Sequence, residues 1–167
     1  MSGRASAALV ALIFLFDRWT KHLVVQGWQL GESTEVVPGF FSLTYLRNRG
    51  AAFGLFADLP EAWRVSFFVV FALATLAALV WMLRTSPRED VAQRLALTAV
   101  IGGAIGNLWD RVRYGEVVDF LDVYVRDWHW PAFNVADSFI TCGVILLVLA
   151  SLRSPQGDSD QPGSAPG

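Results

Sequence analysis

The chain has 167 residues, of which 54% are hydrophobic and 17% are charged. Soluble domains average roughly 45–50% apolar and about 25% charged residues, so this composition indicates a membrane protein of one domain. The formal net charge is −2 and no basic stripe is present, which argues against a nucleic-acid partner. The only cysteine, Cys142, lies in an apolar run. It is interpreted as a small apolar filler, and neither an internal disulfide nor a cysteine-based metal site is expected.

Four apolar stretches approach or reach the roughly 17–25 residues that a helix needs to cross a bilayer. They run from about 5 to 25, 63 to 83, 91 to 109 and 133 to 152. The first carries Asp17 and Lys21 near its end and lacks a small-x-small site, so we interpret it as a retained span and not a cleaved signal peptide. These two residues lie four apart and can pair on one helix face. They form either an ordinary charge pair at a helix end or a polar anchor that shapes a site.

Between the first two spans, the chain predicts a small sheet rather than another helix. Phe41, Leu43 and Tyr45 alternate with serine and threonine, which predicts a strand over 40–46. The Asn-Arg-Gly sequence at 48–50 predicts a turn. We expect the sheet to lie on the membrane surface.

The third span contains a G-x-x-x-G pair, Gly102 and Gly106, which is typical of helices that pack closely. At its end Asp110 is followed by Arg111, and the two could form a solvated pair. The fourth span opens with polar residues at a spacing of three to four, which places them on one helix face that should point to protein or water. These residues are Asn134, Asp137, Ser138 and Thr141.

Elimination leaves carboxylates as the candidate chemistry. His22 and His129 do not lie in a zinc motif, and no glycine-rich phosphate loop is present. Ser138 as a nucleophile would need a base, and Lys21, the conceivable partner, also has Asp17 to satisfy. No cofactor or metal is therefore predicted.

The stretch 102–137 holds five aspartates, and we predict that Asp119 and Asp137 meet at the membrane surface and share a proton. Close carboxylates cannot easily both ionise, so one pKa is raised and the other lowered. The ionised member can take a proton from water while the protonated member polarises a carbonyl, which is peptide hydrolysis without a covalent intermediate. The alternatives from the pattern alone are a proton-coupled transporter and a non-catalytic membrane scaffold. The remaining aspartates of the stretch are Asp110, Asp122 and Asp127.

Five blocks of sequence, in order, resemble the lipoprotein signal peptidases (signal peptidase II), which are bacterial membrane aspartic endopeptidases. The blocks are 17–21 (DRWTK), 48–54 (NRGAAFG), 102–111 (GGAIGNLWDR), 115–120 (GEVVDF) and 133–138 (FNVADS). Arg49 departs from the small or hydroxyl residue that is more usual there. The resemblance implies a mainly helical membrane protein with four transmembrane helices and a small extracytoplasmic β-sheet. It also implies one peptidase domain over 1–153, followed by a tail at 154–167 whose composition predicts disorder.

The resemblance assigns the catalytic pair to Asp119 and Asp137. It implies removal of the signal peptide from diacylglyceryl-modified prolipoproteins, with the cut just before the lipidated cysteine. Asp17 and Lys21 match a motif that supports structure. The residues that match positions lining or bracing the site are Asn48, Gly50, Asn107, Asp110, Arg111, Asn134 and Ala136.

Arginine is modestly richer per residue at the termini and in the link between the second and third spans. The positive-inside rule then places both termini in the cytoplasm and the aspartate pair at the outer face of the bacterial inner membrane. Membrane lipid is an expected partner, and a monomer is expected.

Overall fold

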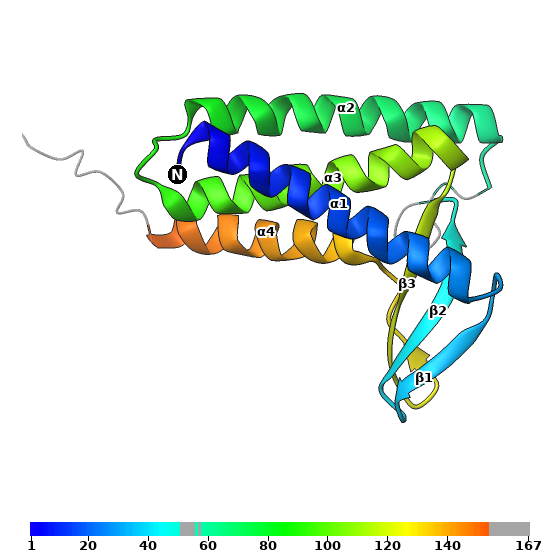
Figure 1. The fold of residues 1–167 in the computed structure, drawn as a ribbon. Helices are drawn as coiled ribbons and strands as arrows, with labels where there is room; N and C mark the ends of the chain where they lie inside the picture. Colours follow the sequence, from blue (N-terminus) through cyan, green and yellow to red (C-terminus); the bar gives the residue numbers. More distant parts are fainter. Residues whose placement is uncertain (51–55, 57, 154–167) are drawn as a thin grey trace, which may run out of the picture.

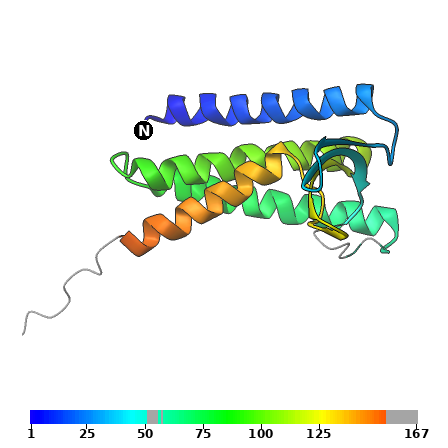
Figure 2. The same cartoon turned by 90° about the horizontal axis from the view of Figure 1, so that it is seen from below.

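The computed structural model describes residues 1–50, 56 and 58–153. Within these residues, helices form a bundle and a small sheet extends from one end of it (Figure 1). The N-terminus and the end of the last helix are both at the opposite end of the bundle (Figures 1 and 2). The four helices are α1 (Gly3–Gly27), α2 (Glu61–Thr85), α3 (Val91–Tyr114) and α4 (Val135–Arg153).

In the described part of the chain, α2, α3 and the α4 segment Val135–Leu152 are long and apolar enough to cross a membrane. The prediction of four transmembrane helices is therefore supported for three of them. Helix α1 has 25 residues, but every stretch of 18 residues in it holds at least three charged side chains. These side chains are Arg4, Asp17, Arg18 and Lys21.

Helix α3 is the centre of the bundle, because it packs against each of the other three helices. It begins where Asp90 accepts a hydrogen bond from the backbone N–H of Gln93 at 2.9 Å. It ends at Gly115, whose φ of 71° is a left-handed conformation that glycine adopts without steric cost. Strand β3 starts only two residues later, so the polar end of α3 lies directly beside the sheet.

Glycines let α3 approach its neighbours closely, as the G-x-x-x-G pair predicts. A Cβ on Gly102 would lie 2.9 Å from the Cβ of Ile13, and one on Gly106 would lie 2.6 Å from Oδ2 of Asp17. Both partners are on α1. Gly103 meets α4 instead, where a Cβ would lie 2.3 Å from a backbone oxygen. The small residues therefore bring two helices against α3 at once.

The sheet has four antiparallel strands in the order β1-β2-β3-β4. The predicted strand over 40–46 is confirmed as β2, although its polar face is not exposed: Ser42 and Thr44 are buried. The Thr44 hydroxyl lies 2.7 Å from that of Ser33 on β1, which offsets the burial. The end of the sheet nearest α1 packs around Val24 of that helix. The strands are β1 (Ser33–Val37), β2 (Phe41–Asn48), β3 (Val117–Val125) and β4 (Trp128–His129).

Two predictions lie outside the described residues. One is the disordered tail at 154–167, and the other is the small apolar segment at 51–54 within the second block of the resemblance.

Candidate active site

Asp137 lies in the first turn of α4 and is held there by a reciprocal cap. The side-chain oxygen of Asn134 accepts a hydrogen bond from the backbone N–H of Asp137 at 2.9 Å. Oδ2 of Asp137 in turn accepts one from the backbone N–H of Asn134 at 3.2 Å. This is a capping box, and it fixes the carboxylate at a helix N-terminus, where the helix dipole stabilises negative charge.

Asp119 lies on β3 and is almost fully buried, with 3% of its surface exposed. Its Oδ2 accepts a hydrogen bond from Nδ2 of Asn48 on β2 at 2.9 Å, and its Oδ1 accepts one from Nδ2 of Asn134 at 2.7 Å. Burial, together with the charge of Asp137, raises the pKa of Asp119 to about 7. The two asparagine hydrogen bonds and the charge of Lys21 act in the opposite direction but do not cancel this effect.

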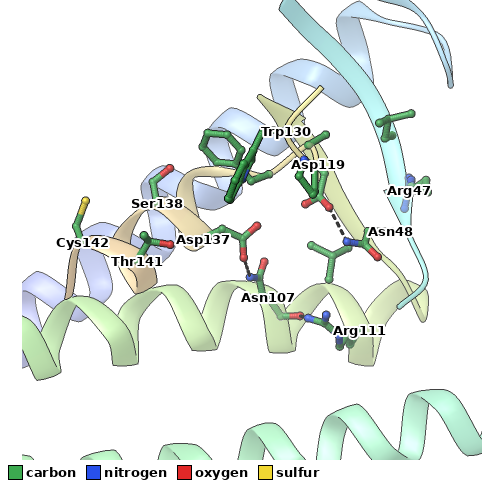
Figure 3. Close-up of a pocket in the computed structure, with 15 residues that line it drawn as sticks. Arg47, Asn48, Asn107, Arg111, Asp119, Trp130, Asp137, Ser138, Thr141 and Cys142 are labelled. Atoms are coloured by element: carbon green, nitrogen blue, oxygen red, sulfur yellow. Dashed lines mark hydrogen bonds between the residues drawn. The ribbon is translucent and has the colours of Figure 1, made fainter. Parts of the chain in front are cut away.

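The two carboxyl groups are joined by a chain of side-chain amides. Nδ2 of Asn107 donates to Oδ1 of Asp137 at 2.7 Å, and Oδ1 of Asn107 accepts from Nδ2 of Asn134 at 3.2 Å. Asn134 also donates to Asp119, so α3, α4 and β3 meet in one network. The close-up shows the Asn48–Asp119 and Asn107–Asp137 hydrogen bonds on the wall of one pocket (Figure 3).

This pocket has a volume of about 860 Å³, and both aspartates line it. The structure therefore brings together the two carboxyl groups that the sequence paired. Asn48, Asn107 and Arg111 also line it. The remaining lining residues are Leu46, Arg47, Val117, Trp130, Pro131, Ala132, Phe133, Ser138, Thr141 and Cys142.

Arg111 and Gly50 meet at the edge of this pocket. One guanidinium nitrogen of Arg111 donates to the backbone oxygen of Gly50 at 3.3 Å, and another to that of Asn107 at 3.3 Å. The guanidinium also lies over the Phe68 ring, 4.9 Å from its centroid. Gly50 N–H donates to the side-chain oxygen of Asn48 at 3.0 Å, which closes the predicted turn and orients the amide of Asn48.

A buried group of charges lies beneath the pocket. The predicted pairing of Lys21 with Asp17 is confirmed at 2.8 Å, and the same ammonium lies 2.9 Å from Oδ2 of Asp110. Arg18 also pairs with Asp110. The alternative of a solvated Asp110–Arg111 pair is wrong, because Asp110 is fully buried and its partners come from α1.

Ala136 is fully buried between these groups. Its backbone N–H donates to Oδ1 of Asp17 at 3.0 Å, which ties the first turn of α4 to α1. Its methyl group faces Gly106, where a Cβ would lie 3.3 Å away. A larger side chain at 136 would therefore collide with α3.

Sequence reasoning did not single out several residues of the site. Arg18 was not proposed as a partner of Asp110, and neither Arg47 nor Trp130 was assigned to the pocket. The signal for Trp130 was its place just before Pro131, at the point where the chain returns to α4. Cys142, interpreted as an apolar filler, lies on the pocket wall and is exposed.

Among the residues that the structure describes, no group of three or more His, Cys, Asp or Glu side chains could hold a metal ion. The polar groups on the pocket wall include two carboxyls, two side-chain amides, two guanidinium groups, and the hydroxyls of Ser138 and Thr141. Such a set can bind a water molecule and exchange protons with it.

The family model described as "Signal peptidase (SPase) II" matches residues 9–153. The chain belongs to the signal peptidase II family. A lipoprotein signal peptidase of Syntrophotalea carbinolica is 49% identical over 145 residues, which cover 87% of this chain and 89% of that protein. One of Actinobacillus succinogenes is 42% identical over 160 residues, which cover 96% and 97% of the two chains.

Solved structures agree with this signal peptidase II assignment. One bacterial membrane enzyme matches with a TM-score of 0.83 and 32% identity, over 97% of this chain and 96% of its own. Another matches with a TM-score of 0.79 and 35% identity, over 90% and 94% of the two chains. This signal peptidase II is thus an aspartic peptidase of the membrane that removes signal peptides from prolipoproteins, rather than a transporter or a scaffold.

Proposed function

We propose that this peptidase cuts diacylglyceryl-modified prolipoproteins just before the lipidated cysteine, by activating a water molecule between Asp119 and Asp137. The observation that carries the proposal is the shared pocket, in which both carboxyl groups are exposed to one volume and held by the same asparagine, Asn134. Among the described residues no ion pair holds either carboxyl group; both instead accept hydrogen bonds from neutral amides.

The environments of the two aspartates suggest different tasks. Asp137 lies at a helix N-terminus and accepts hydrogen bonds from Nδ2 of Asn107 and the backbone N–H of Asn134, which hold it in position to take a proton from water. Asp119 is buried in the sheet, and its raised pKa of about 7 keeps it protonated at mildly acid pH. The pair then titrates as a unit in which Asp119 holds the shared proton.

Peptide hydrolysis follows from that assignment. Asp137 takes a proton from the water as its oxygen attacks the scissile carbonyl carbon, and Asp119 donates its proton to the carbonyl oxygen. The resulting diol collapses when one carboxyl takes back a hydroxyl proton and the other protonates the leaving nitrogen. The C–N bond breaks, which releases the signal peptide as a carboxylate and leaves the lipidated cysteine with a free amino group.

The pocket lies where the bundle meets the sheet, and along α4 its wall continues from Asp137 through Ser138 to Cys142 (Figure 3). A peptide held at that depth by its acyl chains would present its backbone to both carboxyls. Binding energy from the remote lipid would then orient the reacting bond. The proposal therefore requires a lipidated substrate.

We also propose that α1 is a fourth transmembrane helix. Asp17 and Lys21 are fully buried and pair with each other, so these charges do not face lipid. The start of α1 and the last turn of α4 lie at the same end of the bundle (Figure 1). This arrangement fits an even number of crossings with both termini in the cytoplasm. The pocket would then face outward from the bacterial inner membrane. A monomer without a nucleic-acid partner remains our expectation.

Topology can be tested with single cysteines in a Cys142→Ala background. Leu30, which is 65% exposed just beyond α1, should be labelled by an impermeant thiol reagent from outside the cell. A cysteine at Ser2, the N-cap of α1, should be labelled only after the membrane is opened. Labelling of both from the same side would contradict a crossing by α1.

The reaction is tested with purified enzyme and a diacylated precursor peptide, by the masses of the products. One cut before the lipidated cysteine is expected. The same peptide without its acyl chains should be cleaved far more slowly. Equal cleavage of both peptides, or a cut elsewhere, would contradict the proposed substrate and cut site.

A further inference from the structure

The base of the site holds a lysine whose ammonium is completely enclosed. Lys21 has no exposed surface, and its Nζ has three close oxygen partners. They are Oδ2 of Asp17 at 2.8 Å, Oδ2 of Asp110 at 2.9 Å and Oδ1 of Asn107 at 3.0 Å. An ammonium group has three protons and no acceptor, so it can only donate to these oxygens. Two partners are charged carboxylates, and the third is the neutral amide of Asn107, which lines the pocket.

That third contact determines which way round the Asn107 amide lies. Because Lys21 can only donate, the amide must turn its oxygen toward Nζ. Its nitrogen then points the other way and donates to Oδ1 of Asp137 at 2.7 Å. The reversed amide would place one NH₂ against the ammonium and bring an oxygen against the Asp137 carboxylate. Both contacts would be repulsive.

We propose that Lys21 is a positioning residue for the reaction: its buried ammonium orients the Asn107 amide so that this amide always donates to Asp137. The proposal rests on the proposed two-aspartate function and adds a residue that does not itself touch the pocket. Lys21 is absent from the pocket wall, whereas Asn107 and Asp137 both line it.

The same orientation extends to the second carboxyl group. The oxygen of Asn107, held by Lys21, also accepts from Nδ2 of Asn134 at 3.2 Å. Asn134 uses its own oxygen to accept the backbone N–H of Asp137, so its NH₂ group is left to face Asp119 at 2.7 Å. Lys21 thus sets the donor direction of Asn107, the backbone N–H of Asp137 sets that of Asn134, and each carboxyl of the pair receives a donor.

The buried charges around this lysine balance, because Asp17 and Asp110 supply two negative charges and Lys21 and Arg18 two positive ones. Lys21 makes one contact beyond this balance, to the neutral amide oxygen of Asn107 at 3.0 Å. The nitrogen of the same amide donates to Asp137, so this contact connects the buried charges to the pocket.

The test is a double-mutant cycle between Lys21 and Asn107, assayed with the diacylated peptide. Lys21→Met should lower kcat by about 10- to 100-fold with KM changed by less than about threefold, because a misplaced catalytic group costs rate rather than binding. In an Asn107→Ala background, the same Lys21→Met change should lower kcat by less than about threefold further, since the amide it orients is gone.

Arg94 provides a matched control. It is also a buried cation, 6% exposed, and it donates to the backbone oxygens of Leu83 and Ser86 at 2.8 and 2.9 Å at the other end of α3. Arg94→Met should lower thermal stability without lowering kcat. If Lys21→Met does not fold, Lys21→Met with Asp17→Asn removes one charge of each sign and is used in the same cycle.

An equal loss of kcat in both backgrounds would overturn the proposal, as would a Lys21→Met enzyme with normal kcat. These results differ from a failure of the proposed function, which would appear as cleavage by Asp119→Asn or Asp137→Asn enzyme with Lys21 in place. A loss of stability alone, as in Arg94→Met, would assign Lys21 a structural role and would also overturn the proposal.

Discussion

Two groups of aspartates lie close together where the helices meet the sheet, and they differ in what binds them. Asp17 and Asp110 are fully buried and pair with the ammonium of Lys21, and Asp110 also pairs with Arg18. Asp119 and Asp137 line the pocket and accept hydrogen bonds from neutral donors instead.

This difference in binding partners indicates which carboxylates can transfer protons. A carboxylate that is paired with a buried cation is committed to that pairing, because breaking it would leave an uncompensated buried charge. A carboxyl bound by amides has no such constraint, and burial then favours its protonated form. Asp119 illustrates this with its pKa of about 7. The paired group is therefore suited to hold helices together, and the pocket group to move protons.

The strongest expected effect is on the rate of cleavage. Asp137→Asn and Asp119→Asn should each lower kcat by about 10²- to 10⁴-fold or more, because each removes a group that transfers a proton. Product masses from the diacylated peptide measure the rate, and thermal unfolding serves as the control. Near-normal cleavage by either variant would show that the pocket pair is not catalytic.

Substitution in the other group, Asp17 and Asp110, should instead lower the stability of the protein. Asp110→Ala leaves the half-buried Arg18 without its carboxylate and the buried Lys21 with only one. Breaking a buried pair typically costs about 3–5 kcal/mol, so the detergent-solubilised protein should unfold at a much lower temperature. Asp127→Ala, at an exposed aspartate on the β3–β4 turn, is the control and should leave that temperature unchanged. If Asp110→Ala and Asp127→Ala changed the unfolding temperature by equally small amounts, the distinction between the two groups of aspartates would be wrong.

Helix packing supports both groups and can be weakened without touching a charge. In Gly103→Ala the new Cβ would lie 2.3 Å from the backbone oxygen of Ala136, so α4 must shift. Overpacking of this kind costs about 1–3 kcal/mol, and the shift should displace the neighbouring Asp137 and lower kcat. Gly27→Ala is the control, because a Cβ at this position would meet no atom within 4 Å. It should neither destabilise the protein nor lower kcat.

Local sequence patterns were enough to predict much of this arrangement. Apolar length predicts the helices, the spacing of four predicts the Asp17–Lys21 pair, and Gly102 with Gly106 predicts close helix packing, for which the structure supplies α1 as the partner. From the sequence pattern alone, the pairing of Asp119 with Asp137 was one alternative among several. The resemblance of the five sequence blocks to the signal peptidase II family made this pairing specific.

The rest depends on contacts between distant parts of the chain. Asp110 was open to a solvated interpretation because its partners Arg18 and Lys21 lie on another helix, about 90 residues earlier. Helix α3 continues to Tyr114, beyond the predicted end at 109, because Arg111 and Arg113 suit the last turn of a helix and Gly115 ends it. The first four residues of β3 are all buried, so no alternation marked that strand.

The pH dependence sharpens the comparison within the pocket. Asp119 must be protonated to act as the acid, so kcat should fall as the pH rises through about 7. Nδ2 of Asn48 stabilises the ionised form of Asp119, and Asn48→Ala should therefore raise its pKa. Since a hydrogen bond to a charged group contributes about 1.5–3 kcal/mol, the alkaline limb should move up by about one pH unit. A downward shift, or none, would assign the proton to the other carboxyl.

The smallest effect is expected at a charge pair that belongs to neither group. Arg49 lies 3.2 Å from Glu116, and its side chain is 65% exposed, so water screens the pair. Exposed pairs of this kind contribute about 0–1 kcal/mol. Arg49→Ser, which restores the side-chain size more usual in the family, should therefore leave kcat within about twofold and the unfolding temperature within about two degrees. A large loss of kcat with unchanged stability would mean that Arg49 contacts the substrate, and that the charges serving this pocket extend beyond the two aspartate groups.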